Sequence, residues 1–298
     1  MSRPLLTPEL ASRLDRLDLV ARLVVEGFLT GLHKSPYHGF SVEFAEYRQY
    51  IPGEPVAHVD WRVYAKTDRH YRKVFTEETN LRATLLVDCS ASMSFTADPG
   101  RPSKLDYARL LAAALAYLLL RQNDAVGLVT FDEKPLAVVP ARSVRRQLFP
   151  ILRTLETAPA GAGTRLGPVL HGIAERVHRR GLVLLFSDLM DEPAEVLSGL
   201  KHFRHRGHEV VVFQILDPRE TDLGFKRELE LVDLERPGRR LRIDPAQVRG
   251  EYRRRFDAWR GSLRCESRRH LVDLVEVTTD TPLEAALHAY LSRRRRLY

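Results

Sequence analysis

The chain has 298 residues, 44% of them hydrophobic, and a formal net charge of +8 at pH 7. This length and hydrophobic content exclude wholesale disorder and predict one large globular α/β domain or two smaller ones. Two cysteines are too few for a disulfide framework or a four-cysteine zinc site, and no stretch approaches the roughly 20 apolar residues of a membrane-spanning helix. Because the first residues also lack the apolar segment of a signal peptide, we expect a cytoplasmic protein without a membrane span.

The N-terminal part predicts a helix followed by a small β-rich subdomain. The sequence Thr7-Pro8-Glu9 is typical of a helix start, and apolar residues at helical spacing extend the predicted helix over 7–32. Aromatic residues then partly alternate along the chain, which favours short strands, with a short helix at 59–66 and a strand at 70–76. We therefore predict that residues 1–80 form an N-terminal helix and a small β subdomain.

From residue 81 onward, short apolar runs alternate with helical segments. This alternation predicts a doubly wound, mostly parallel sheet that is buried on both faces, over residues 81–298. Charged and apolar residues around Pro237-Gly238 interrupt the alternation and predict an inserted hairpin near 217–244. The predicted strands are 82–88, 125–131, 135–139, 182–187, 209–216 and 271–277, and the predicted helices are 104–121, 144–156, 166–179, 193–205, 245–269 and one from about 282.

Polar side chains follow the predicted strands where an open parallel sheet places its ligand site. Asp88, Ser90 and Ser92 alternate at the end of one strand, so that all three side chains can face one point. Thr164 lies in a loop before a helix, and Asp188 follows another strand. These five oxygen-bearing side chains predict a site for a hard cation, Mg²⁺ in the first place, with Mn²⁺ or Ca²⁺ as alternatives.

The Asp-x-Ser-x-Ser motif of residues 88–92, with Thr164 and Asp188, resembles the metal-ion-dependent adhesion site of von Willebrand factor A domains. The wider chain is similar to the bacterial domain of unknown function 58 (DUF58) family. The segments that carry this resemblance are Gly39–Phe44, Tyr47–Tyr50, Pro52–Glu54, Asp60-Trp61 and Phe131-Asp132.

The resemblance implies a von Willebrand factor A-like fold with the metal at the point where the strand order reverses. It also implies a Mg²⁺-dependent protein-binding adaptor that works with a MoxR-type AAA+ ATPase in the assembly or maturation of complexes. The metal would then capture an acidic side chain of a client protein. The sequence departs from the family's usual threonine loop, because Arg165 follows Thr164 and adds a positive charge beside the expected cation.

Three other interpretations compete with this one. Serines and an aspartate after a strand are also typical of a helix cap. A nucleic-acid-associated protein would use the basic helix at 249–269 and the terminal arginines 293–296. A metal-dependent phosphoester hydrolase would need a base and a nucleophile, which the sequence does not supply, so we predict no catalytic residues and no enzymatic activity.

Overall fold

The computed structural model describes residues 16–33, 46–49, 71–74, 81–161, 163, 165–225, 227–235 and 238–294. Contacts divide the chain into two compact units, one of Met1–Thr30 with Leu81–Tyr298 and the other of Gly31–Asn80. The first unit thus includes most of the N-terminal helix α2 (Leu17–His33), which we expected to belong with the small subdomain. The two predicted ranges, 1–80 and 81–298, remain predictions.

The larger unit contains a six-stranded sheet in the order β10-β7-β6-β3-β4-β5. All neighbours are parallel except β4 and β5, which form an antiparallel pair at one edge. Counted by their order along the chain from the β5 edge, the six strands follow the sequence 3-2-1-4-5-6, which is the order of a doubly wound sheet. The predicted fold is confirmed. The strands are β3 (Arg82–Asp88), β4 (Ala125–Phe131), β5 (Pro135–Arg142), β6 (Leu182–Ser187), β7 (Glu209–Leu216) and β10 (Val272–Thr278).

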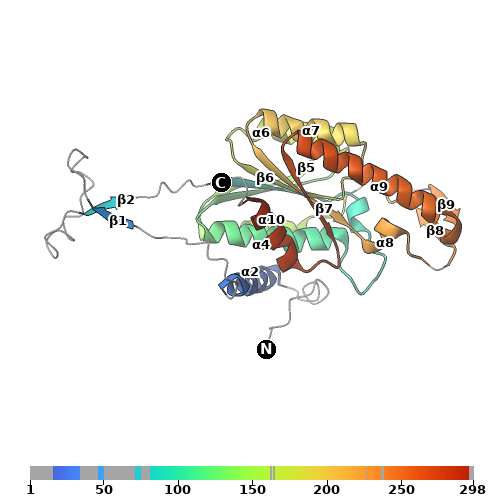
Figure 1. Ribbon diagram of the computed structural model, residues 1–298, viewed down its shortest axis with the longest axis horizontal. Coiled ribbons are helices and arrows are strands. Elements are labelled where there is room, and N and C mark those ends of the chain that lie inside the picture. Colours follow the sequence, from blue (N-terminus) through green and yellow to red (C-terminus); the bar gives the residue numbers. More distant parts are fainter. Residues whose placement is uncertain are drawn as a thin grey trace. The chain divides into compact units, whose positions relative to one another are not determined.

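Helices cover both faces of this sheet, as Figure 1 shows, with α6, α7 and α9 on one face and α4 and α10 on the other. Strands β3, β6 and β7 are almost wholly buried, which explains why they are continuous apolar runs in the sequence. Helix α4 is buried nearly all round, in keeping with its run of alanine and leucine. The helices are α4 (Lys104–Arg121), α5 (Leu148–Thr157), α6 (Leu166–Arg176), α7 (Pro193–His205), α9 (Pro245–Arg269) and α10 (Leu283–Arg294), and the 3₁₀ helices are η2 (Ser92–Ser94) and η3 (Arg145–Gln147).

A short helix and a two-stranded ribbon lie within the segment where we expect an inserted hairpin. Helix α8 (Pro218–Asp222) comes first, and β8 (Leu229–Val232) then pairs antiparallel with β9 (Arg240–Ile243). Helix α8 was not predicted. It begins with a capping box. The Asp217 side chain accepts a hydrogen bond from the Glu220 backbone N–H, and the Glu220 side chain accepts one from the Asp217 backbone N–H.

The smaller unit contains one antiparallel pair, β1 (Glu46–Gln49) with β2 (Tyr71–Val74). Strand β2 lies within the predicted strand 70–76, whereas the predicted helix 59–66 lies outside the described residues. Of the predicted helix 7–32, the structure describes the part from residue 16 onward, with α2 beginning at Leu17, and residues 7–15 lie outside it. Among the described helices, none is both long enough and apolar enough to cross a membrane.

Candidate functional site

The candidate site lies at the carboxyl ends of β3 and β6, two neighbouring strands in the middle of the sheet. Asp88 is the last residue of β3, and Asp188 directly follows the last residue of β6. The order of the strands reverses between these two, because the chain proceeds from β3 to β4 on one side and from β6 to β7 on the other. The polar side chains therefore gather where a doubly wound sheet binds its ligands.

Asp88 is 1% exposed and both of its carboxylate oxygens accept hydrogen bonds. The backbone N–H of Ser90 donates to Oδ1 at 2.9 Å, and the Ser187 hydroxyl donates to Oδ2 at 2.7 Å. Burial, with a further contribution from the negative charge of Asp188, raises the pKa of Asp88 to about 7. The two hydrogen bonds offset this only in part, so ionisation of Asp88 places an incompletely compensated negative charge in the interior.

The hydroxyl groups of Ser90 and Ser92 lie side by side at the start of η2, with their Oγ atoms 3.1 Å apart. Ser90 is fully buried and Ser92 is half-buried, so the pair extends from the interior toward the surface. Oxygens that bind Mg²⁺ at about 2.1 Å in octahedral geometry lie about 3.0 Å from their neighbours. The observed separation is therefore close to that of two adjacent ligands of one such ion.

Of the five predicted metal ligands, hydrogen bonds bring Asp88, Ser90 and Ser92 together. Asp188 follows the neighbouring strand and is close enough for its charge to raise the pKa of Asp88, and Thr164 lies outside the described residues. The loop that leads to Thr164 approaches the site closely at Gly161, whose N–H donates to the Cys89 carbonyl at 2.5 Å. A Cβ atom at Gly161 would lie 2.7 Å from the Asp132 Cβ, so this approach requires glycine.

Cys89 and Arg165, two neighbours of predicted ligands, differ in burial. Cys89 is buried, as predicted for a packing residue, and burial raises the pKa of its thiol to about 12. Arg165 is exposed.

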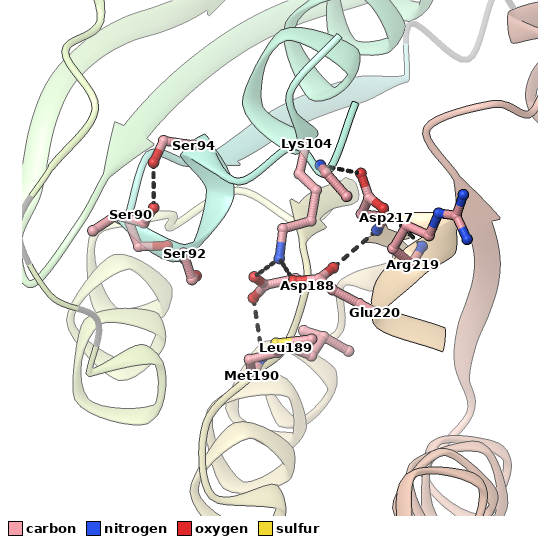
Figure 2. A network of polar contacts seen from close by, with 12 residues as sticks. Ser90, Ser92, Ser94, Lys104, Asp188, Leu189, Met190, Asp217, Arg219 and Glu220 are labelled. Carbon is pink, nitrogen blue, oxygen red and sulfur yellow. Dashed lines mark hydrogen bonds and ion pairs between the residues drawn. The ribbon is translucent and has the colours of Figure 1, made fainter. Parts of the chain in front are cut away.

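Sequence reasoning missed a buried lysine in the site. Figure 2 shows Lys104 reaching from the start of α4 to a position between Asp188 and Glu220. Its ammonium group donates to Asp188 Oδ2 at 2.8 Å and to Glu220 Oε1 at 2.7 Å, and its side chain is fully buried. Burial alone would lower the pKa of Lys104, but the two carboxylates hold it above its ordinary value, so the ammonium group is charged.

The cluster as a whole carries an excess of negative charge. When all are ionised, the three carboxylates of Asp88, Asp188 and Glu220 face the single ammonium group of Lys104, which leaves a formal charge of −2. A buried charge of this size calls for a compensating cation or for protonation. Two carboxylates and two hydroxyls form a hard, oxygen-only donor set, which fits a divalent cation such as Mg²⁺. Among the described residues, no three His, Cys, Asp or Glu side chains gather to hold a metal by themselves.

The basic helix that the nucleic-acid interpretation requires is α9, and many of its arginines are paired with carboxylates. Arg260 and Arg264 both contact Glu276 on β10, and Arg254 and Arg255 contact Glu251 on the helix itself. These pairs neutralise part of the charge that phosphate binding would use. Of the terminal arginines 293–296, the last two lie outside the described residues.

Comparison with known proteins gives one family match and several similar proteins. The model of the family described as protein of unknown function DUF58 matches residues 46–281. An uncharacterized protein of Mycobacterium tuberculosis (strain ATCC 25618 / H37Rv) is 30% identical over 293 residues, covering 97% of this chain and 91% of that protein. Among solved structures, an aerotolerance-related membrane protein from Bacteroides fragilis is 16% identical, with a TM-score of 0.49 over 72% of this chain and 99% of that chain. The SpRpn10 VWA domain is 11% identical, with a TM-score of 0.41 over 70% of this chain and 94% of that domain.

Proposed function

The chain belongs to the DUF58 family, and we propose that it is a Mg²⁺-dependent adaptor that binds other proteins through the site at the ends of β3 and β6. The observation that carries this proposal is the buried cluster of Asp88, Ser90, Ser92 and Asp188, whose oxygens and excess negative charge suit one divalent cation. Mn²⁺ and Ca²⁺ are the alternative ions.

In this proposal Ser90, Ser92 and Thr164 bind the cation directly, and Asp88 and Asp188 bind it directly or through water. A bound Mg²⁺ supplies a position at which a carboxylate oxygen of another protein can bind. Ser92 is half-buried, so the cluster is accessible from its side. Hydroxyl ligands add no negative charge, and the metal therefore keeps its attraction for an incoming carboxylate.

A groove of about 770 Å³ beside Ser92 supports a protein as the ligand. It extends from Ser92 and Asp191 to the β8–β9 ribbon, within the larger unit. Several of the large apolar side chains that the structure exposes line it, and such patches are typical of protein interfaces. These side chains are Met190, Leu231, Val232 and Leu234. A client segment can thus place an acidic side chain on the metal and apolar side chains in the groove.

The partner we propose is a MoxR-type AAA+ ATPase, together with a client protein that offers the acidic side chain. This part rests on the family resemblance carried by the sequence segments described above. The ATPase would supply the energy for assembly or maturation, and the chain described here would select the client.

The first experiment measures Mg²⁺ binding and client capture together. We expect purified wild-type protein to bind Mg²⁺ in calorimetry and to retain client and ATPase in pull-downs with Mg²⁺, and to lose them in EDTA. Asp88→Ala should lose both, whereas Asp98→Ala, which removes an exposed carboxylate from a nearby loop, should keep both. Circular dichroism checks that each variant is folded. Equal capture in EDTA and in Mg²⁺ would contradict the proposal.

The second experiment separates the groove from the metal. Leu231→Asp places a charge among the apolar side chains of the groove and should weaken client capture without changing Mg²⁺ binding. Phe149→Asp is the matched control, since Phe149 is 71% exposed and does not line the groove. If both variants capture clients like the wild type, the groove is not part of the binding surface.

A further inference from the structure

Lys104 is the most deeply buried charged side chain of the site, and the metal-binding proposal does not use it. It is the first residue of α4, with 0% of its side chain exposed. Its ammonium group is held by two carboxylates from distant parts of the chain and lies 5.8 Å from the centre of the Phe95 ring. Removing a buried charge from water is unfavourable, and these contacts are what compensates for it.

One of the two carboxylates is itself a candidate metal ligand. Asp188 Oδ1 accepts a hydrogen bond from the Met190 N–H at 3.0 Å, and Oδ2 accepts one from Lys104 at 2.8 Å. Both oxygens are therefore engaged in the structure, the second by a positive charge. A divalent cation that binds at Asp188 must share the carboxylate with Lys104 and lies close to its like charge.

The other carboxylate connects Lys104 to the groove. Glu220 Oε1 accepts from Lys104, and its Oε2 accepts from the Asp217 N–H at 2.9 Å as part of the capping box of α8. Glu220 and its neighbour Arg219 line the groove beside Ser92. When a metal draws Asp188 away from Lys104, the ammonium group can keep its contact with Glu220, so α8 stays anchored.

We propose that Lys104 is a built-in counter-cation that competes with the metal for Asp188 and thereby limits the metal affinity of the site. The proposal rests on the metal-binding function proposed above and concerns how strongly the metal is held. It explains how Asp188 and Glu220 are compensated without a metal, since the Lys104 ammonium group contacts both carboxylates. It also favours release of the metal, because the Lys104 ammonium group takes the place of the metal ion at Asp188 when the ion leaves.

The test compares Lys104→Met with the wild type by calorimetric titration with Mg²⁺ and with Mn²⁺. Methionine is of similar length and is uncharged, so Asp188 becomes available to the metal alone. We expect Lys104→Met to bind either ion at least about tenfold more tightly than the wild type. In EDTA its melting temperature should lie below that of the wild type, and Mg²⁺ should raise it by more than it raises that of the wild type. Lys104→Arg keeps the charge and should bind the metal as weakly as the wild type.

Two double variants identify the carboxylates involved. Lys104→Met/Asp188→Asn should lose the gain in affinity, because the competition is for Asp188. Lys104→Met/Glu220→Gln removes one cation and one carboxylate together, so it preserves the charge balance and provides a folded variant if Lys104→Met alone unfolds. It should keep the tighter metal binding.

The outcomes separate the two proposals. If the wild type binds Mg²⁺, Asp88→Ala does not, and the folded Lys104 variants bind it no more tightly than the wild type, then the role of Lys104 is overturned and the metal site stands. If neither the wild type nor the Lys104 variants bind Mg²⁺ or Mn²⁺, the metal-binding function itself is overturned.

Discussion

Asp88 should make the stability of the metal-free protein fall as the pH rises, and Asp88→Asn should remove that dependence. The pKa of Asp88 is raised from 3.8 to about 7 in the folded protein. Between these two values, the folded protein keeps a proton on Asp88 that the unfolded chain has already lost. The free energy of unfolding therefore decreases as the pH rises through this range.

The size of the effect follows from the shift. One pKa unit corresponds to 1.36 kcal/mol. A shift of this size means that the free energy of unfolding of the wild type, measured against that of Asp88→Asn, should be about 4 kcal/mol lower at pH 8 than at pH 4. Asparagine suits the comparison because it preserves the shape of the side chain and cannot ionise. It can accept the hydrogen bond from the Ser90 N–H and donate one to the Ser187 hydroxyl.

The assay is urea unfolding in EDTA, followed by circular dichroism at half-unit steps from pH 4.5 to 8. Other buried groups also titrate, so the quantity to compare is the difference in free energy of unfolding between the two proteins at each pH. At pH 7.5, saturating Mg²⁺ should restore stability to the wild type and not to Asp88→Asn. Parallel stability curves for the two proteins would refute the reasoning, because they would mean that Asp88 is no harder to ionise in the folded state than in the unfolded one.

Two further changes test the geometry of the site. Ser92→Ala should weaken Mg²⁺ binding about tenfold or more in calorimetry. It should leave urea unfolding in EDTA nearly unchanged, since Ser92 is half-buried and its hydroxyl makes one hydrogen bond, to Ser90, among the described residues. Gly161→Ala should lower the free energy of unfolding by about 1–3 kcal/mol. The added Cβ would lie 2.7 Å from the Asp132 Cβ and 3.0 Å from the Cys89 carbonyl oxygen. An unchanged free energy of unfolding would mean that the loop before Thr164 moves aside freely.

The sheet could be predicted because strands that are buried on both faces are uniformly apolar in sequence. The runs 82–88 and 125–131 coincide with β3 and β4, and the long helix at 245–269 coincides with α9. The antiparallel direction of β5 also had a signal. Only three residues separate the end of β4 from the start of β5, which is too few for the crossover that a parallel pair requires.

The metal ligands could be predicted to the extent that local spacing determines them. Asp88, Ser90 and Ser92 are neighbours in the sequence, and an extended strand end places alternate side chains together whatever the rest of the chain does. Asp188 followed from the rule that parallel strands end at the same edge of a sheet. Helix α8 was missed although Asp217 and Glu220 have the three-residue spacing of a capping box, because the charged segment around it favoured a hairpin.

Lys104 and Glu220 could not be placed in the site in the same way, because they are 116 positions apart along the chain and only the fold brings them together. One local signal was nevertheless present. Lys104 is a cation in the first turn of a helix, where the macrodipole favours acidic residues such as Asp106, and after Arg109 that helix carries no charged residue until Arg121. A lysine in so unfavourable a position indicates that other charges hold it there. The overall charge of +8 gave no sign of this, since most of the surplus lies in the C-terminal region, whereas the ammonium group of Lys104 is buried between the carboxylates of Asp188 and Glu220.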